Sequence, residues 1–105
     1  MTYARVVATI LLVEDDERIS EPLLRVLSTE GFDVIHASTG NAGLDAVSTG
    51  RPSLVLLDLT LPDIDGLDVC RKIREDQPEL PVILLEDLGA LVGLPGQPCG
   101  LVFRA

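Results

Sequence analysis

Carboxylates follow two short apolar runs in this 105-residue sequence, and their types and positions could support chemistry. Glu14 and Asp15 come directly after the run that ends at Val13, and Asp58 comes directly after residues 54–57. If the two runs are neighbouring parallel strands, these acids converge beyond the strands' carboxyl ends, where open α/β sheets bind ligands. Clustered carboxylates repel one another unless a cation lies among them, and hard oxygen ligands suit Mg²⁺. We therefore predict a Mg²⁺ site, whose cation would also offset the charge of a phosphoryl group delivered to Asp58.

Other polar residues have simpler explanations. Asp16 and Glu17 lie where a helix is expected to begin, and acids are favoured in a first helical turn. The only histidine, His36, lies on a short predicted strand, and we interpret it as structural. The only lysine, Lys72, lies in a helical segment, and we interpret it as part of a solvated face.

Short strands that alternate with helices must position the carboxylates. The predicted strands are residues 10–13, a short strand that includes Phe32 and Val34, residues 54–57 and residues 82–85, and a helix is expected in each of the three intervals between them. The apolar face of the first helix is formed by Ile19, Leu23, Val26 and Leu27. Pro22 should lie in the first turn of that helix, because further along it would cause a kink. Strands that are apolar on both faces indicate a doubly wound α/β sheet, which is parallel and covered by helices on both sides.

The composition excludes several classes of function. The chain has 17 acidic and 8 basic residues, a net charge of −9, and one Tyr, two Phe and no Trp. This balance weighs against direct nucleic-acid binding, which uses basic faces and aromatic platforms. The apolar runs are too short to span a bilayer, so we expect no membrane association. Two cysteines make no disulfide framework, which favours a cytoplasmic location.

Two motifs resemble the receiver domain of two-component response regulators. They are Leu11–Asp16, LLVEDD, and Leu56–Leu67, LLDLTLPDIDGL. The resemblance covers residues 9–85. Within this range the local sequence also resembles the subfamily of winged-helix transcription factors. It implies a flavodoxin-like doubly wound parallel sheet of strand order 2-1-3-4-5. The fifth strand and the last helices are doubtful or missing, because the C-terminal quarter is truncated or altered relative to the family.

The resemblance also implies roles for individual residues. Asp58 takes the place of the aspartate that a sensor histidine kinase phosphorylates. Glu14 and Asp15 match the acidic pair that holds Mg²⁺ together with Asp58, and the backbone carbonyl of Thr60 matches a further ligand. The chain would then be a phosphoacceptor and not an enzyme, catalysing only its own phosphorylation and dephosphorylation. In longer relatives this step controls DNA binding and transcription.

The last quarter of the chain departs from the family pattern. Receivers place Thr or Ser after the fourth strand and Lys at the end of the fifth, whereas this chain has Glu86 and, near the second place, Arg104. We therefore expect poor switching on phosphorylation. We expect residues 1–105 to form a single receiver domain without an output domain, in which residues 86–105 are a divergent tail.

Two other functions stay open. One is a switch-deficient, receiver-like module that binds partners. The other is a Mg²⁺-dependent phosphohydrolase in which Asp58 is the nucleophile toward a small phosphoester. The expected partners are a sensor histidine kinase and, if the edge of the fourth strand is uncovered, a second copy of the chain in a homodimer.

Overall fold

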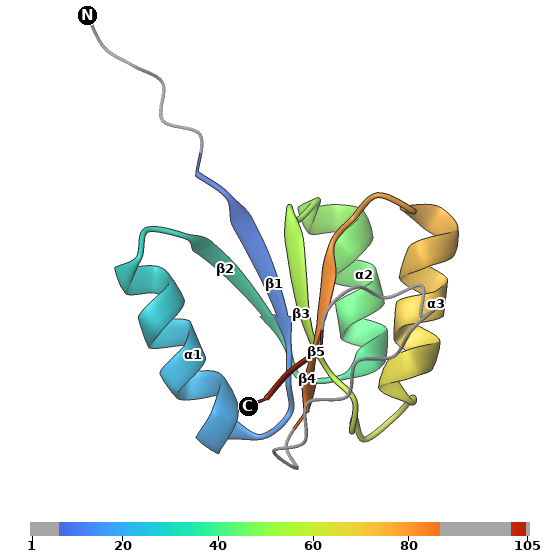
Figure 1. Ribbon diagram of the computed structural model, residues 1–105, viewed down its shortest axis with the longest axis horizontal. Helices are drawn as coiled ribbons and strands as arrows, with labels where there is room; N and C mark the ends of the chain where they lie inside the picture. Colours follow the sequence, from blue (N-terminus) through green and yellow to red (C-terminus); the bar gives the residue numbers. More distant parts are fainter. Residues whose placement is uncertain (1–6, 87–101, 105) are drawn as a thin grey trace, which may run out of the picture.

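Strands and helices alternate along the chain in the computed structural model, which describes residues 7–86 and 102–104 (Figure 1). The strands are β1 (Thr9–Val13), β2 (Asp33–Ala37), β3 (Leu54–Asp58), β4 (Val82–Glu86) and β5 (Val102–Arg104). The helices are α1 (Glu17–Thr29), α2 (Gly40–Gly50) and α3 (Gly66–Asp76).

The described strands form one parallel sheet in the order β2-β1-β3-β4-β5. Helix α1 lies on one face of the sheet, and α2 and α3 lie on the other (Figure 1). The predicted doubly wound α/β architecture with strand order 2-1-3-4 is confirmed. Val13 of β1 pairs with Ala37 of β2 and Leu57 of β3, so the carboxyl ends of these three strands lie side by side.

The strand at the outer edge, β5, is only three residues long. It pairs with the end of β4, with Val102 opposite Leu84 and Arg104 opposite Glu86. The sequence predicts that the fifth strand is doubtful or missing, and this short segment is what the structure describes in its place. Residues 87–101 hold most of the predicted divergent tail and the interval of a last helix, and they lie outside the described residues.

The apolar core has one part on each face of the sheet. Leu11 and Val13 of β1 are fully buried against the side that α2 and α3 cover. Ile10 and Leu12 belong to the smaller cluster on the side of α1. Alternate residues of a strand point to opposite faces, so a strand covered on both sides reads as a continuous apolar run. This is why the sequence pattern located the strands.

Helix α1 differs from its prediction in two respects. The side chain of Asp16 caps the helix by accepting a hydrogen bond from Arg18 N (2.9 Å), so the helix begins at Glu17. Pro22 therefore lies inside the helix, and its predicted place in the first turn is wrong. Val26 is 57% exposed, so its predicted place on the apolar face is also wrong. The helix is turned so that Leu24 packs toward the sheet instead.

Candidate functional site

The predicted acidic residues meet at the carboxyl ends of β1 and β3. Glu14 follows β1 directly, and its N–H donates to the carbonyl oxygen of Ala37 (3.0 Å), which extends the pairing of β1 with β2. Asp58 is the last residue of β3. The Glu14 side chain is 1% exposed and that of Asp58 is 7% exposed, whereas Asp15 is exposed. The sheet therefore holds two of the three carboxylates away from solvent.

The three carboxylates are close enough to share one cation. One oxygen from each of Glu14, Asp15 and Asp58 lies within 4.8 Å of the others, and the described residues contain no other such group. Glu14 Oε1 accepts a hydrogen bond from Asp16 N (3.0 Å), while Glu14 Oε2 is buried without a hydrogen-bond partner. A hard divalent cation binds carboxylate oxygens, and the buried Glu14 Oε2 needs such a partner. The three carboxylates together are therefore a suitable ligand set for the cation.

The electrostatics of the cluster favour the same conclusion. The pKa of Glu14 is raised from 4.5 to about 7. Burial of the carboxyl group is the largest cause, and the neighbouring Asp58 and Asp15 carboxylates act in the same direction, against the hydrogen bond from Asp16 N. Without a cation, Glu14 is therefore partly protonated near neutral pH, where an exposed glutamate is fully ionised.

Thr60, the fourth predicted site residue, lies beside Asp58. Its N–H donates to Asp58 Oδ1 (3.2 Å), so the loop after β3 turns back toward the carboxylate. Gly66 closes this loop by donating its N–H to the carbonyl oxygen of Leu59 (3.1 Å). A Cβ at Gly66 would lie 2.5 Å from the carbonyl oxygen of Asp58, so only glycine permits this close approach.

Two residues next to the site were not predicted to support it. His36 Nε2 lies 2.8 Å from the carbonyl oxygen of Glu14, so the side chain of β2 pins the backbone that carries the first carboxylate. Asp63 accepts hydrogen bonds from the N–H groups of Gly40 (2.8 Å) and Asn41 (2.9 Å). Both contacts join residues 22 or 23 positions apart, and no local spacing in the sequence signals them.

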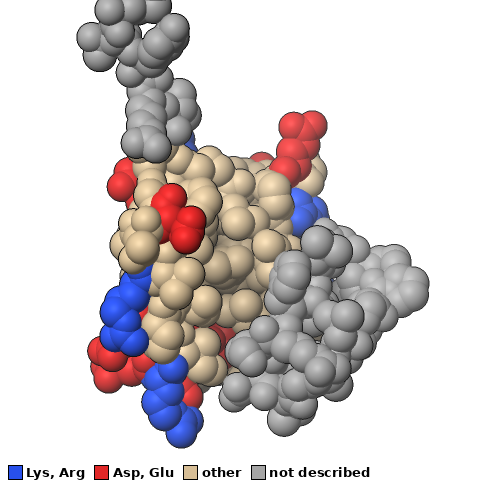
Figure 2. Space-filling view, turned by 60° about the vertical axis from the view of Figure 1, so that its left-hand side comes forward, with Lys and Arg blue, Asp and Glu red and all other residues tan. Residues whose placement is uncertain are grey.

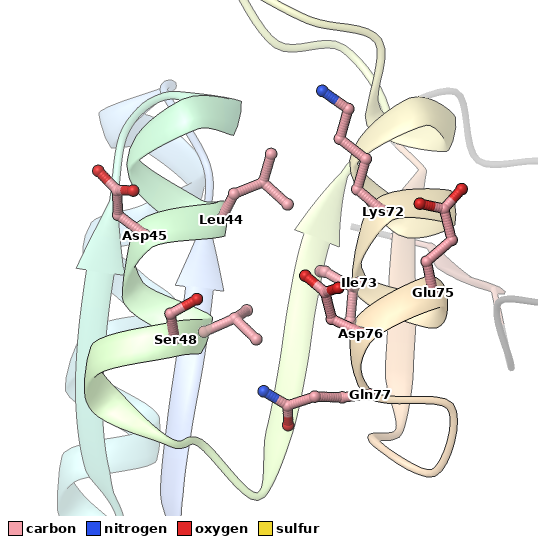
Figure 3. A pocket seen from close by; sticks show the side chains of 9 residues that line it. Leu44, Asp45, Ser48, Lys72, Ile73, Glu75, Asp76 and Gln77 are labelled. Atoms are coloured by element: carbon pink, nitrogen blue, oxygen red, sulfur yellow. The ribbon is translucent and has the colours of Figure 1, made fainter.

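A groove of about 360 Å³ lies between α2 and α3, away from the acidic cluster (Figure 3). Leu44, Val47 and Ile73 contribute apolar surface to it, and Asp76 and Gln77 extend into the space between the helices. None of the predicted site residues lines this groove.

Residues 10–89 match the response regulator receiver domain family. The chain is 42% identical over 76 residues to response regulator MprA of Mycolicibacterium vanbaalenii, with 72% of this chain and 33% of the relative covered. It is 47% identical over 76 residues to the DNA-binding response regulator MtrA of Mycolicibacterium smegmatis, with the same coverage. The chain spans about a third of the length of these relatives.

Two solved structures show the same fold. The response regulator TrrA of Thermotoga maritima in complex with Mg²⁺-BeF is 35% identical, with a TM-score of 0.72 over 75% of this chain and 69% of that chain. A complex of the histidine kinase ThkA with TrrA matches with a TM-score of 0.85 and 28% identity, over 94% of this chain and 86% of that chain.

The chain therefore belongs to the response regulator receiver domain family. It is a receiver domain of the two-component phosphorelay, a phosphoacceptor rather than a conventional enzyme, and its acidic cluster is consistent with a phosphorylation site. Among the described residues, no helix is long and apolar enough to cross a membrane.

Proposed function

We propose that this chain accepts a phosphoryl group on Asp58 from a sensor histidine kinase, in the cytoplasm and with Mg²⁺ as cofactor. The observation that carries the proposal is the cluster of Glu14, Asp15 and Asp58, in which the buried Glu14 Oε2 has no hydrogen-bond partner. In this proposal residues 1–105 act as one receiver domain, of which residues 9–85 follow the family pattern.

Each residue of the cluster has a separate task. Glu14, Asp15, Asp58 and the backbone carbonyl of Thr60 hold the cation, which when bound offsets the negative charges of the carboxylates and of the incoming phosphoryl group. An oxygen of Asp58 forms the new bond to phosphorus while the bond from phosphorus to the kinase imidazole nitrogen breaks. The N–H of Thr60 keeps the Asp58 carboxylate oriented, because it donates to Oδ1.

The partners follow from charge and from the relatives. TrrA is a response regulator whose complex with a histidine kinase has been solved, which supports a kinase as the phosphoryl donor here. On the face shown in Figure 2, the few basic side chains lie among acidic ones, and the net charge is −9. This acidic balance supports the proposal that the chain itself does not bind nucleic acid directly. DNA binding by a longer relative is part of the same proposal, and so is a homodimer, although the end of the β4 edge that was expected to be uncovered pairs with β5.

A switch-deficient interaction module is the second candidate, and one observation favours it. β4 ends in Glu86, an acid at the place where receivers have a Thr or Ser hydroxyl. In this case Asp58 would resist phosphorylation, or would accept the group without a change in the partner surface.

Incubation with acetyl phosphate and Mg²⁺, followed by intact mass spectrometry, tests the proposal. We expect an adduct of one phosphoryl group on the parent chain and none on Asp58→Asn, which keeps the shape of the side chain and removes the nucleophile. Equal labelling of the variant would show that the assignment of Asp58 is wrong. An unlabelled parent would favour the interaction module, and turnover of a small phosphoester would favour the phosphohydrolase.

A further inference from the structure

Asp63 lies in the loop between β3 and α3, and its carboxylate is bound by a different helix. Oδ1 accepts a hydrogen bond from Gly40 N (2.8 Å) and Oδ2 accepts one from Asn41 N (2.9 Å). These are the first two N–H groups of α2, which have no partner within their own helix. The third, Ala42 N, donates to Thr39 Oγ1 (3.0 Å). Asp63 thus completes the cap of α2 from outside the helix.

The same loop also packs against α2 through apolar contacts. A Cβ at Gly40 would lie 2.6 Å from Cγ1 of Ile64 in the loop and 2.9 Å from Cγ2 of Val69 in α3, so both the loop and α3 touch α2 closely at this glycine. Charge-assisted hydrogen bonds and close packing therefore act at neighbouring residues. The loop cannot leave α2 without breaking both.

The other end of this loop lies at the acidic cluster. Thr60 N donates to Asp58 Oδ1, and Gly66 N donates to the carbonyl oxygen of Leu59, so the loop is closed beside the phosphoacceptor. Asp63 lies between Thr60 and Gly66 in this loop, and its side chain forms hydrogen bonds with the N-terminus of α2. Its hydrogen bonds also lower the pKa of its carboxyl group, so it is charged at neutral pH.

We propose that Asp63 is a positioning residue, which ties the loop to the N-terminus of α2 and so holds Thr60 in place to complete the cation site. This inference rests on the proposed function, because it concerns the cation site of Glu14, Asp15 and Asp58. These hydrogen bonds also connect the cation site to α2, so cation binding changes the environment of the Gly40 and Asn41 amides.

Titration of the chain with Mg²⁺, followed by amide NMR spectra, tests the inference. We expect Asp63→Ala to weaken Mg²⁺ binding by at least about threefold, a size typical of residues that act through a neighbour. Asp63→Asn keeps one acceptor oxygen and should fall between the parent and the alanine variant, and it serves as the test if Asp63→Ala does not fold. The amide signals of Gly40 and Asn41 should shift with Mg²⁺ in the parent and lose this response in Asp63→Ala.

The matched control is Asp45→Ala, which removes an exposed acid from α2. Among the described residues, the side chain of Asp45 forms no hydrogen bond or ion pair. It changes the net charge by the same amount and should leave Mg²⁺ affinity unchanged. If Asp63→Ala and Asp63→Asn bind Mg²⁺ as the parent does, or if Asp45→Ala weakens binding equally, the inference is wrong. If the parent itself does not bind Mg²⁺, the proposed cation site fails and this inference fails with it.

Discussion

Glu14 is the residue at which burial and charge conflict within the acidic cluster. Its side chain is 1% exposed, and its Oε2 atom has no hydrogen-bond partner. A buried carboxylate that is not fully hydrogen-bonded destabilises the folded chain while it is charged. The same unpaired oxygen is available to a cation. The charged Glu14 side chain therefore lowers the stability of the metal-free chain and raises the affinity for the metal.

Replacement of this side chain by its neutral isostere should separate the two effects. We expect Glu14→Gln to raise the free energy of unfolding in EDTA at pH 8 by about 1–3 kcal/mol, because the buried charge is removed. The variant should also lose most of the stabilisation that Mg²⁺ gives to the parent by mass action. Chemical denaturation with EDTA and with Mg²⁺ measures both. A variant that is less stable than the parent in EDTA would contradict this account of Glu14.

The pH dependence of the metal-free chain follows from the same group. The pKa of Glu14 in the folded chain, about 7, lies above its value of 4.5 in an unfolded chain, so the folded state binds the proton more tightly. The stability contribution of Glu14 is therefore fully present below pH 4.5 and is lost as the pH rises toward and through 7. In EDTA, the difference in unfolding free energy between Glu14→Gln and the parent should grow from pH 5 to pH 8. A constant difference would contradict the raised pKa.

The residues of the acidic cluster could be predicted from the sequence, but the residues that support them could not. Glu14, Asp15 and Asp58 could be predicted because each acid directly follows a buried apolar run, a pattern visible along the chain. His36 and Asp63 could not, because their contacts depend on strand register and on how a loop folds back. Until β1 and β2 are paired, nothing places His36 beside the carbonyl oxygen of Glu14.

The side chain of Arg74 makes hydrogen bonds to the connection between α3 and β4. Arg74 Nη1 donates to the carbonyl oxygens of Pro78 (2.7 Å) and Leu80 (2.8 Å), just beyond the end of α3. We expect Arg74→Met to lower the free energy of unfolding by about 1.5–3 kcal/mol, because these carbonyls lose a charged donor. Arg71→Met is the control on the same helix. It removes only the exposed ion pair with Asp68 and should cost less than about 0.5 kcal/mol. Equal effects of the two variants in denaturant titrations would contradict this role for Arg74.

Helices and strands differed in how well their ends could be predicted. The strands β1, β3 and β4 lie within one residue of the predicted ranges, because two covered faces leave an uninterrupted apolar run. The start of α1 was set by the side chain of Asp16, which outweighed the usual preference for proline in a first turn. Which face of α1 is buried depended on packing against the sheet, so Val26 was assigned to the wrong side.

At the scale of the whole molecule, the sheet order could be predicted and the C-terminal edge could not. Alternating strands and helices with covered faces leave few topologies, and the resemblance to receivers selected one of them. The segment after β4 and the start of β5 lack a comparable pattern, because residues 86–101 have no sustained periodicity and include four Gly or Pro within residues 95–100. The register that brings Arg104 opposite Glu86 emerges only from the folded sheet.

We expect that edge of the sheet to decide whether phosphorylation can change the conformation of the chain. A ligand shifts a conformational equilibrium only by its different affinity for the two states. Receivers use a hydroxyl after the fourth strand and a lysine after the fifth to bind the phosphoryl group. Here those places hold Glu86 and, by register, Arg104, whose planar guanidinium is not equivalent to an ammonium. A shift from 1:99 to 99:1 requires about 5.5 kcal/mol, and a charge-assisted hydrogen bond contributes about 1.5–3 kcal/mol. Without both family contacts, phosphorylation should therefore shift the conformational equilibrium of this chain only weakly.

We expect beryllofluoride, a phosphoryl mimic, to shift amide NMR signals near Asp58 and the loop that follows it, and to leave β4 and β5 nearly unchanged. The physical reason is that the sequence has an acid, Glu86, at the position where receivers have a neutral hydroxyl donor. Spectra recorded with Mg²⁺, before and after addition of beryllofluoride, measure the extent of the response. Glu86→Thr supplies the missing hydroxyl and removes the acid, so it should spread the shifts into β4, whereas Glu79→Thr removes an exposed acid before β4 and should not. Large shifts in the parent that extend from Asp58 through β5 would show that a working switch survives in this chain.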